Sequence, residues 1–402
     1  MRASDYLWSA RIEVQSIRAS ANGKGHTKEL AVASAFAELA ERLSAGMETG
    51  IDIGPFRQLY GIKGDMLSKV TTYKYMEGYT YDNQDNLTNA IKVEDFCRRL
   101  SFSDYDFKTM KKESELLRHW IYGYSLTREK VVQVPILFVK WISSTNGLAS
   151  GNTIEEAIAH GCREIFERNA MIDFLRGETP SEQCPIIDQA TIQNDIIKKQ
   201  LEFFNYNNVD VIIRNIGNEL YPVFAVLTYN SSIPKSNLGY NHIKAGCSFN
   251  SDEAIIRCFT ERMQGTNINF EKSQGKMPED ITPDRHMSLF FKGICPMDLT
   301  HLMHGSTKPY VPFSEDDIAV EINSCVDIAN KLNTEVIVIN HTHPVIKFPT
   351  ARVIMPGISD FMKWWDPAKI IPNLVGNLQP EEDAYEEKLL SVLNSFFYKG
   401  TV

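Results

Sequence analysis

Two segments of the chain, residues 25–44 and 151–168, arrange polar and apolar positions with the period of an amphipathic helix. The polar stripe of the first segment contains Ser34, Glu38 and Glu41, and its apolar stripe contains Val32, Phe36, Leu39 and Leu43. The polar stripe of the second contains Glu156, His160, Glu164 and Glu167, and its apolar stripe contains Ile158, Cys162 and Ile165. We therefore predict two helices that keep their acidic side chains in the same register.

Both segments start at a glycine and carry Glu-x-x-Glu-Arg, which ends at Arg42 in the first and at Arg168 in the second. Glu38 follows Gly25 by 13 residues, and Glu164 follows Gly151 by the same 13 residues. Because residues three apart share a helix face, each helix presents two carboxylates with an arginine beside them. Four convergent carboxylates would suit a hard cation.

A solvated helix face is the simpler interpretation of either motif alone, because Glu-x-x-Glu-Arg commonly forms weak local pairs in water. The recurrence of the motif at a matched distance from a glycine favours a repeated structural task instead. Both interpretations stay open from the pattern alone.

A third predicted helix begins near Ser251 and carries a cation on its polar stripe. That stripe contains Arg257, Glu261 and Gln264, spaced i, i+4 and i+7. The guanidinium group of arginine matches phosphate through its planar fork of donors. Acidic helices, an arginine and glycine-led helix starts together indicate Mg²⁺ with the phosphates of a nucleotide.

The rest of the pattern predicts an α/β protein of mixed α+β type. Strands are predicted at residues 11–17, 131–141, 209–213, 222–228, 335–339 and 353–357, and further helices at 316–332 and 381–397. A capping box, Thr153-x-x-Glu156, specifies the start of the second acidic helix. Because no low-complexity linker interrupts the sequence, we expect one multilayer domain, residues 1–375, followed by a C-terminal helix and tail, residues 376–402.

Composition and charge restrict the class of protein. Of the 402 residues, 43% are hydrophobic, which is enough for a sizeable core, and the net charge of −9 argues against a protein that coats nucleic acid. No apolar run approaches the roughly 20 residues of a membrane helix, and the first residues do not form a signal peptide. Seven scattered cysteines without a C-x-x-C pair argue against a disulfide framework and a thiolate zinc site. We expect a cytoplasmic protein with no nucleic-acid or membrane partner.

Four groups of residues closely resemble signatures of the YcaO family, ATP-dependent enzymes that activate backbone amides. They are Asn22-Gly-Lys-Gly-x-Thr-Lys with Ser34-Ala and Glu38-x-x-x-Arg42-Leu-Ser44; Asn146-Gly with Gly151-Asn-Thr and Glu164-x-Phe166-Glu167-Arg168; Thr260-Glu261-x-x-Gln264-Gly265; and Ile354-x-Pro356-Gly357-x-Ser359-Asp360. Together they span residues 22–360. The resemblance implies a YcaO-like fold of sheets covered by helices, in which the repeated helices form a nucleotide site.

The resemblance also implies which residues hold ATP and Mg²⁺. The residues that match the nucleotide site of the family are Ser34, Glu38, Glu41, Asn152, Glu156, Glu164, Glu167, Arg168 and Arg257. Its metal ligands would be Glu38, Glu41, Glu164 and Glu167, with the two arginines as phosphate clamps. The residues with a catalytic role would be Glu164, Glu167, Arg168 and Arg257.

In the reaction of the family, a nucleophile attacks a peptide carbonyl, ATP phosphorylates the resulting oxygen, and loss of phosphate leaves an azoline, a thioamide or an amidine. The protein contributes to this reaction by positioning the reactants and by neutralising charge at the γ-phosphate. The chain ends in Phe397-Tyr-Lys-Gly-Thr-Val402 and lacks the proline-rich tail of many azoline-forming members. This difference favours thioamide formation, or a role as accessory factor in ribosomal protein S12 methylthiolation.

Three functions stay open. The first is ATP-dependent amide activation for thioamidation or sulfur modification, the second is an azoline-forming cyclodehydratase of a modified-peptide pathway, and the third is a non-catalytic ATP-binding scaffold. A peptide or protein substrate is expected for both enzymes. Because only about twenty residues precede the first motif, a fused peptide-recognition domain is not expected, and a TfuA-like or sulfur-delivery protein would act as a separate partner. We also expect a homodimer.

Overall fold

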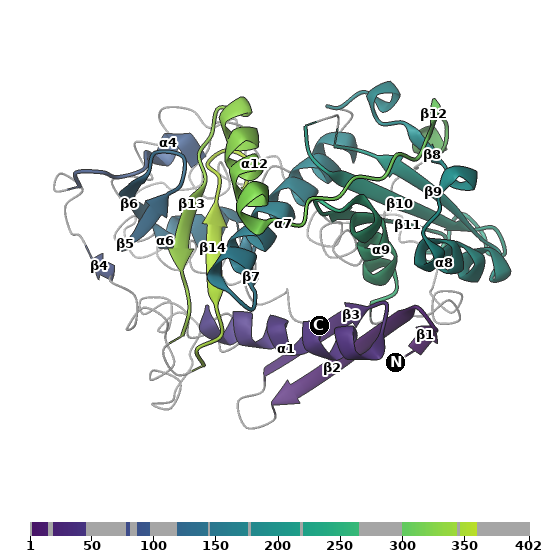
Figure 1. Ribbon diagram of the computed structural model, residues 1–402, viewed down its shortest axis with the longest axis horizontal. Helices are drawn as coiled ribbons and strands as arrows, with labels where there is room; N and C mark the ends of the chain where they lie inside the picture. The colour runs from purple at the N-terminus through teal and green to yellow at the C-terminus, as the bar shows by residue number, and fades with distance from the viewer. Residues whose placement is uncertain are drawn as a thin grey trace, which may run out of the picture. The chain divides into compact units, whose positions relative to one another are not determined.

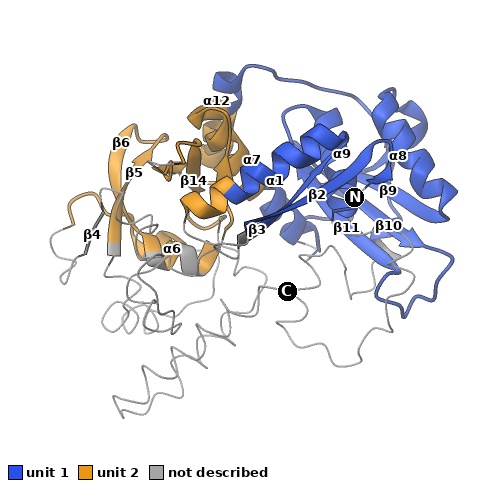
Figure 2. Cartoon of the chain, turned by 90° about the horizontal axis from the view of Figure 1, so that it is seen from below, with its two compact units in different colours: residues 1–39, 166–321 blue, residues 40–165, 322–402 orange. Residues whose placement is uncertain are grey.

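The computed structural model describes residues 2–14, 19–45, 78–80, 87–96, 119–143, 145–175, 178–217, 220–264, 300–343 and 346–359. The chain divides into two compact units, which Figure 2 shows in different colours. Unit 1 comprises Met1–Leu39 and Phe166–Glu321, and unit 2 comprises Ala40–Ile165 and Ile322–Val402. Three helices each contain residues of both units: α1 (Lys28–Ser44), α7 (Ile154–Leu175) and α12 (Ile318–Lys331).

Unit 1 begins with a three-stranded antiparallel sheet, labelled in Figure 1, of β1 (Arg2–Ser4), β2 (Leu7–Val14) and β3 (Ala19–Gly25). Helix α1 follows β3 and packs directly on its backbone. A Cβ atom on Gly23 would lie 2.1 Å from the carbonyl oxygen of Ala31. The side chains that α1 buries are correspondingly small, since Ala31 and Ala35 are 1% and 0% exposed.

The buried face of α1 corrects the predicted apolar stripe. Phe36, which the prediction places toward the core, is 60% exposed, whereas its neighbour Ala35 is fully buried. Ala31, Ala35 and Leu39, spaced four residues apart, form the buried face, so Leu39 is buried as predicted and the face is turned by less than the roughly 100° of one residue. The close approach to the bare backbone of β3 admits alanine and excludes phenylalanine, and this steric limit outweighs the hydrophobicity of Phe36.

The larger sheet of unit 1 has the strand order β11-β10-β9-β8-β12. The strands are β8 (Ile186–Asp188), β9 (Val209–Asn215), β10 (Val223–Asn230), β11 (Asn241–Cys247) and β12 (Thr307–Pro309). Neighbours are antiparallel except for β12, which runs parallel to β8. Short 3₁₀ helices lie at Ser181–Gln183, Gln189–Thr191 and Thr300–Met303.

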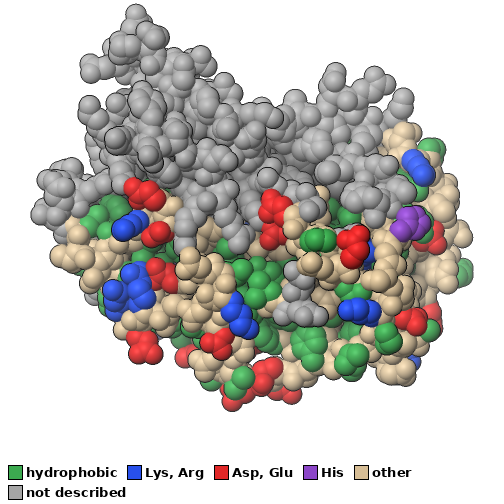
Figure 3. All heavy atoms as spheres, turned by 90° about the horizontal axis from the view of Figure 1, so that it is seen from above, with side chains coloured by type: hydrophobic (Ala, Val, Ile, Leu, Met, Phe, Trp, Pro, Cys, Tyr) green, Lys and Arg blue, Asp and Glu red, His purple; other side chains and the backbone are tan. Residues whose placement is uncertain are grey.

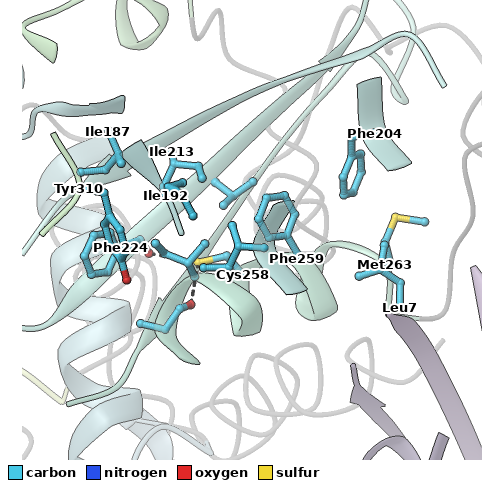
Figure 4. Packing of buried hydrophobic residues seen from close by; sticks show 14 of the residues in the cluster. Leu7, Ile187, Ile192, Phe204, Ile213, Phe224, Cys258, Phe259, Met263 and Tyr310 are labelled. Carbon is cyan, nitrogen blue, oxygen red and sulfur yellow. Dashed lines mark hydrogen bonds between the residues drawn. The ribbon is translucent and has the colours of Figure 1, made fainter. Parts of the chain in front are cut away.

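Helices α8 (Asp195–Tyr206) and α9 (Ser251–Arg262) pack against one face of this sheet and enclose the main core of the unit, shown in Figure 4. The rings of Phe204 and Phe259 lie 5.6 Å apart, and Cys258 Sγ donates to the carbonyl oxygen of Ala254 at 3.2 Å. Each helix has an asparagine N-cap, and the Asn250 side chain accepts a hydrogen bond from the amide of Glu253 at 3.1 Å. The apolar face packs α9 against the sheet, and the cap specifies the residue at which the helix starts.

Unit 2 contains a six-stranded sheet with the order β4-β5-β13-β14-β7, in which β6 also pairs with β5. The strands are β4 (Gly78–Thr80), β5 (His119–Ser125), β6 (Lys130–Pro135), β7 (Leu148–Ser150), β13 (Ile337–Asn340) and β14 (Thr350–Ile354). The shorter helices of the unit are α4 (Val93–Phe96) and α6 (Ile136–Ser143).

Mixed helices and sheets confirm the predicted fold class, with corrections to the bounds of several elements. The strand expected at residues 131–141 ends at Pro135, and the helix α6 starts at Ile136. A short apolar run does not distinguish a buried strand from a buried helix, and proline cannot donate to a sheet ladder. The predicted C-terminal helix and tail, residues 376–402, lie outside the described residues. Among the helices that the structure describes, none has both the length and the hydropathy of a membrane span.

Candidate nucleotide site

Each Glu-x-x-Glu pair contains one residue of each unit. On α1, Glu38 belongs to unit 1 and Glu41 to unit 2, and on α7, Glu164 belongs to unit 2 and Glu167 to unit 1. All four glutamates and Ser34 are partly buried. In the described ranges, no three His, Cys, Asp or Glu side chains are grouped as ligands for a metal. The four-carboxylate metal site therefore stays a prediction.

Asn152 and Glu156 are bonded to each other at the start of α7. Glu156 Oε2 accepts hydrogen bonds from Asn152 N at 2.8 Å and from Asn152 Nδ2 at 2.9 Å. The amide of Glu156 donates to Thr153 Oγ1 at 3.2 Å, as the capping box predicts. These bonds satisfy donors at the helix start, and a contact of either residue with nucleotide stays a prediction.

Glu164 contacts a glycine turn within unit 2. Its Oε2 atom accepts a hydrogen bond from Gly147 N at 3.3 Å. Gly147 has a φ of +79°, and a Cβ atom there would lie 2.2 Å from the carbonyl oxygen of Val353, so the turn requires glycine. Next to it, Asn146 Nδ2 donates to the carbonyl oxygen of Ser359 at 2.9 Å. The structure thus brings together two of the sequence motifs, Asn146-Gly and Pro356-Gly-x-Ser359.

Unit 1 holds a group of partly buried charged side chains that we call the charge cluster. Its members are Lys24 from β3, Glu167 from α7, Lys244 from β11, and Arg257 and Glu261 from α9. Each carboxylate interacts electrostatically with all three cations. Lys24 Nζ forms an ion pair with Glu261 Oε1, and Glu167 Oε2 accepts a hydrogen bond from the amide of Cys247 at 3.3 Å. The cluster therefore joins Glu167 and Arg257, two residues that the sequence motifs place 90 positions apart.

The pKa values of the two carboxylates in the cluster are shifted in opposite directions. Burial raises the pKa of Glu167 from 4.5 to about 7, although Arg257, Lys24 and Arg168 act to lower it. Burial also acts to raise the pKa of Glu261, but Lys24, Lys244 and Arg257 outweigh it and lower that pKa to about 2. Glu261 is therefore a carboxylate throughout the neutral range, whereas Glu167 exchanges its proton near neutrality. Shifts of this kind, which separate the pKa values of neighbouring titratable groups, are common at functional sites.

Two cations of the cluster were not among the predicted site residues. Lys24 belongs to the Asn22-Gly-Lys-Gly motif, and its partner Glu261 is distant in sequence. Lys244 interrupts an otherwise buried strand, and burial lowers its pKa. A lysine in the middle of a buried strand is the signal in the sequence that could have identified it, because lysine is seldom buried without a partner.

The donors of the cluster fit a phosphate chain. Arg168 interacts with Glu167, Arg262 with Lys244, and the exposed Glu253 with Arg257. Together with the cluster, the charged side chains named here are five cations and three carboxylates, whereas the whole chain has a net charge of −9. On the face shown in Figure 3, by contrast, the described acidic and basic side chains are interspersed. A partly buried excess of positive charge favours an anion such as polyphosphate.

Comparison with known proteins gives a family match over the same motifs. A family model described as YcaO cyclodehydratase, ATP- and Mg²⁺-binding, matches residues 22–359. The Escherichia coli (strain K12) protein named ribosomal protein S12 methylthiotransferase accessory factor YcaO is 23% identical over 382 residues, 88% of this chain and 60% of the relative. An uncharacterized protein in the tfuA 3' region of Rhizobium leguminosarum bv. trifolii is 24% identical over 226 residues, 54% of this chain and 52% of the relative.

The solved structures include similar folds. The structure of YcaO from Methanopyrus kandleri, bound with AMPPCP and Mg²⁺, has a TM-score of 0.53 at 17% identity and covers 87% of this chain and 81% of that one. The chain spans 60% or less of the length of the curated relatives described above. The structural likeness shows the fold, and the family model covers well over half of the sequence. This chain belongs to the YcaO family.

Proposed function

We propose that the protein binds ATP with Mg²⁺ and phosphorylates the oxygen of a peptide backbone amide, for thioamide formation or as accessory factor in the sulfur modification of a protein. The observation that carries the proposal is the charge cluster, in which Arg257 and two lysines interact with Glu167 within the region that the family model matches. An excess of partly buried cations is suited to the γ-phosphate, where charge is transferred.

The residues have distinct tasks in this proposal. Arg257 and Arg168 hold phosphate oxygens, since guanidinium groups bind them through two parallel hydrogen bonds. Glu38, Glu41, Glu164 and Glu167 hold Mg²⁺, and Ser34, Asn152 and Glu156 contact the nucleotide. When ATP is bound, transfer of its γ-phosphoryl group turns the amide oxygen into a leaving group. The protein contributes position and charge, with no covalent step of its own.

An azoline-forming cyclodehydratase is the second candidate, and the description of the family model as a cyclodehydratase favours it. Both enzymes phosphorylate the amide oxygen and differ in the nucleophile, which is a side chain of the peptide for an azoline and an external sulfur donor for a thioamide. A scaffold that binds ATP without transfer is the third candidate. The relative in the tfuA 3' region supports a TfuA-like partner, and we propose a homodimer.

Calorimetry with AMPPCP tests the nucleotide site without turnover. With MgCl₂ we expect a dissociation constant between low micromolar and millimolar, the range common for enzyme substrates. Binding should weaken when EDTA replaces MgCl₂. Folded protein that binds no AMPPCP in the presence of MgCl₂ would contradict the proposal.

Mass spectrometry of a candidate peptide separates the three functions. Peptide labelled with ¹⁸O at the backbone carbonyl should transfer the label to inorganic phosphate in both enzymatic cases. Replacement of oxygen by sulfur in the peptide would identify a thioamide, and loss of water would identify an azoline. A scaffold would bind ATP and release no labelled phosphate with any candidate peptide.

A further inference from the structure

The strand β3 presents different chemistry on its two faces. Gly23 and Gly25 face α1, where a Cβ atom would lie 2.1 Å from Ala31 O and 2.7 Å from Ala31 N. Successive side chains of a strand point to opposite faces, so Lys24 points away from α1. The Asn22-Gly-Lys-Gly motif therefore gives one face of β3 to the first acidic helix and leaves the other face to a lysine.

The lysine face of β3 is attached to the end of α9. Lys24 Nζ pairs with Glu261 Oε1, and the side chains of these two residues are 23% and 19% exposed. A second bond lies close by, because Gln264 Nε2 donates to the carbonyl oxygen of Asn22 at 3.1 Å. Glu261 and Gln264 belong to the Thr-Glu-x-x-Gln-Gly motif. Two motifs that the proposed function leaves without a task are thus bonded to each other.

Glu261 also interacts with a lysine of the larger sheet. Lys244 and Gly246 lie two residues apart on β11 and share a face. A Cβ atom on Gly246 would lie 2.2 Å from the carbonyl oxygen of Ala254, so this face of β11 is in close contact with α9. Lys244 interacts with Glu261 from this face. The carboxylate of Glu261 therefore interacts with lysines of two different sheets.

We propose that Lys24 and Lys244 are positioning residues, which hold Glu261 and thereby fix Arg257, one helical turn earlier on α9, relative to the helix that carries Ser34 and Glu38. The inference rests on the proposed function, since a polyphosphate needs its arginine at a set distance from the residues of α1. The contact of the glycine face of β3 with α1 fixes α1 relative to β3, and the Lys24–Glu261 pair fixes α9 relative to β3.

A purely stabilising task would not require charged groups here. Partly buried ion pairs lose much of their attraction to desolvation, and apolar replacements are often as stable. The same helix α9 packs elsewhere on this sheet through Ala254, Ile255, Cys258 and Phe259, which are all fully buried apolar residues. Apolar packing thus holds α9 over most of its length, whereas three charged side chains, Lys24, Lys244 and Glu261, interact near Arg257.

Binding of AMPPCP to single variants tests the inference. We expect Lys24→Met and Lys244→Met to weaken AMPPCP binding at least tenfold, and Lys24→Arg to stay within about threefold of the wild type. Affinity for AMP, which lacks the β- and γ-phosphates, should change less than twofold in all three. Lys199→Met is the matched control, because Lys199 Nζ donates to Tyr6 Oη at 2.6 Å on the exposed surface of the same unit. It should bind AMPPCP as the wild type does.

Glu261→Gln distinguishes positioning from direct contact of the lysines with phosphate. Loss of a negative charge should tighten phosphate binding if Glu261 has no positioning task, whereas the inference expects weaker binding. The measurement is repeated in EDTA, so that an effect on Mg²⁺ cannot account for the result. Lys24→Met combined with Glu261→Gln should lose less affinity than the two single changes together.

The outcomes separate this inference from the proposed function. Wild-type protein that fails to bind AMPPCP with MgCl₂ contradicts the proposed function. If the wild type binds and Lys24→Met binds equally well, or if Glu261→Gln binds more tightly in EDTA, the positioning task is refuted. Circular dichroism confirms folding of each variant, and Lys24→Gln replaces Lys24→Met if the latter does not fold.

Discussion

Replacement of Glu167 by glutamine should stabilise the metal-free protein and impair its reaction. Glutamine keeps the size of the side chain. It also keeps an oxygen that can accept the hydrogen bond from Cys247 N, which measures 3.3 Å in the wild type. It removes a carboxylate whose pKa burial raises from 4.5 to about 7. A raised carboxyl pKa means that the folded state holds its proton more tightly than the unfolded state, so ionisation opposes folding.

The sign and size of the effect follow from that pKa. Below about pH 4.5 the carboxyl is protonated in both states, and the variant and the wild type should be equally stable. Between pH 4.5 and 7 the wild type loses stability relative to the variant, and above 7 the full difference is present. A rise from 4.5 to about 7 is equivalent to about 3 kcal/mol, and we expect about 1 to 2 kcal/mol because Glu167 keeps part of its solvent contact.

Thermal unfolding in EDTA at pH 5 and pH 8 measures this difference. At pH 8 the melting temperature of Glu167→Gln should exceed that of the wild type by roughly 2–4 °C per kcal/mol, the scale for a unit of this size. ATP turnover with Mg²⁺ should fall by at least about 10²-fold. A variant that is less stable than the wild type at pH 8, or that turns over ATP normally, would refute the reasoning. Lys199→Met should change neither quantity.

Three further changes address unit 1, and the third is compared with a glycine of unit 2. Arg257→Lys keeps the charge and loses the planar fork, so ATP turnover should fall at least about tenfold, whereas an exposed pair worth about 0.2–1 kcal/mol would leave it unchanged. Glu261→Gln should lower the urea midpoint of unfolding at pH 7. This midpoint should converge with that of the wild type as pH falls from 4.5 toward 2, because a carboxyl group whose pKa is lowered to about 2 stabilises the fold only while it is charged. A constant difference between the two midpoints across this pH range would contradict that pKa. Gly246→Ala should destabilise the protein by about 2 kcal/mol or more, since its Cβ would lie 2.2 Å from Ala254 O, and Gly123→Ala, whose nearest atom is a side-chain methyl at 3.0 Å, should be milder in the same melting assay.

Local patterns in the sequence predicted many elements of the fold. The strands near residues 209 and 222, the helix that starts at Ser251 and the helix near 316 are present in the structure. Each of these elements either extends over enough residues to show its hydrophobic periodicity or begins at a clear cap. The outward position of Phe36 could not be predicted in this way, because it depends on the glycines of β3, a tertiary contact that the helix sequence does not contain.

Members of the cluster could be predicted where each lies on the polar stripe of its own amphipathic helix. The sequence identified Glu167 and Arg257 from their stripes and from the family motifs, and the structure brings these two together. Lys24 and Lys244 were missed because their partner Glu261 comes from another element. Charge compensation over long sequence distances leaves no periodic pattern, so only the folded chain reveals it.

The alternation of glycine and lysine along β3 also limits the insertions and deletions that the chain can accept. A single residue added or removed within β3, between Ala19 and Gly23, would exchange the faces of the rest of the strand, placing the lysine against α1 and the glycines toward α9. Both contacts would be lost together, because the 2.1 Å approach at Gly23 leaves no volume for a longer side chain. The segment of β3 before Gly23 should therefore change length among relatives only by an even number of residues, or where a bulge restores the register.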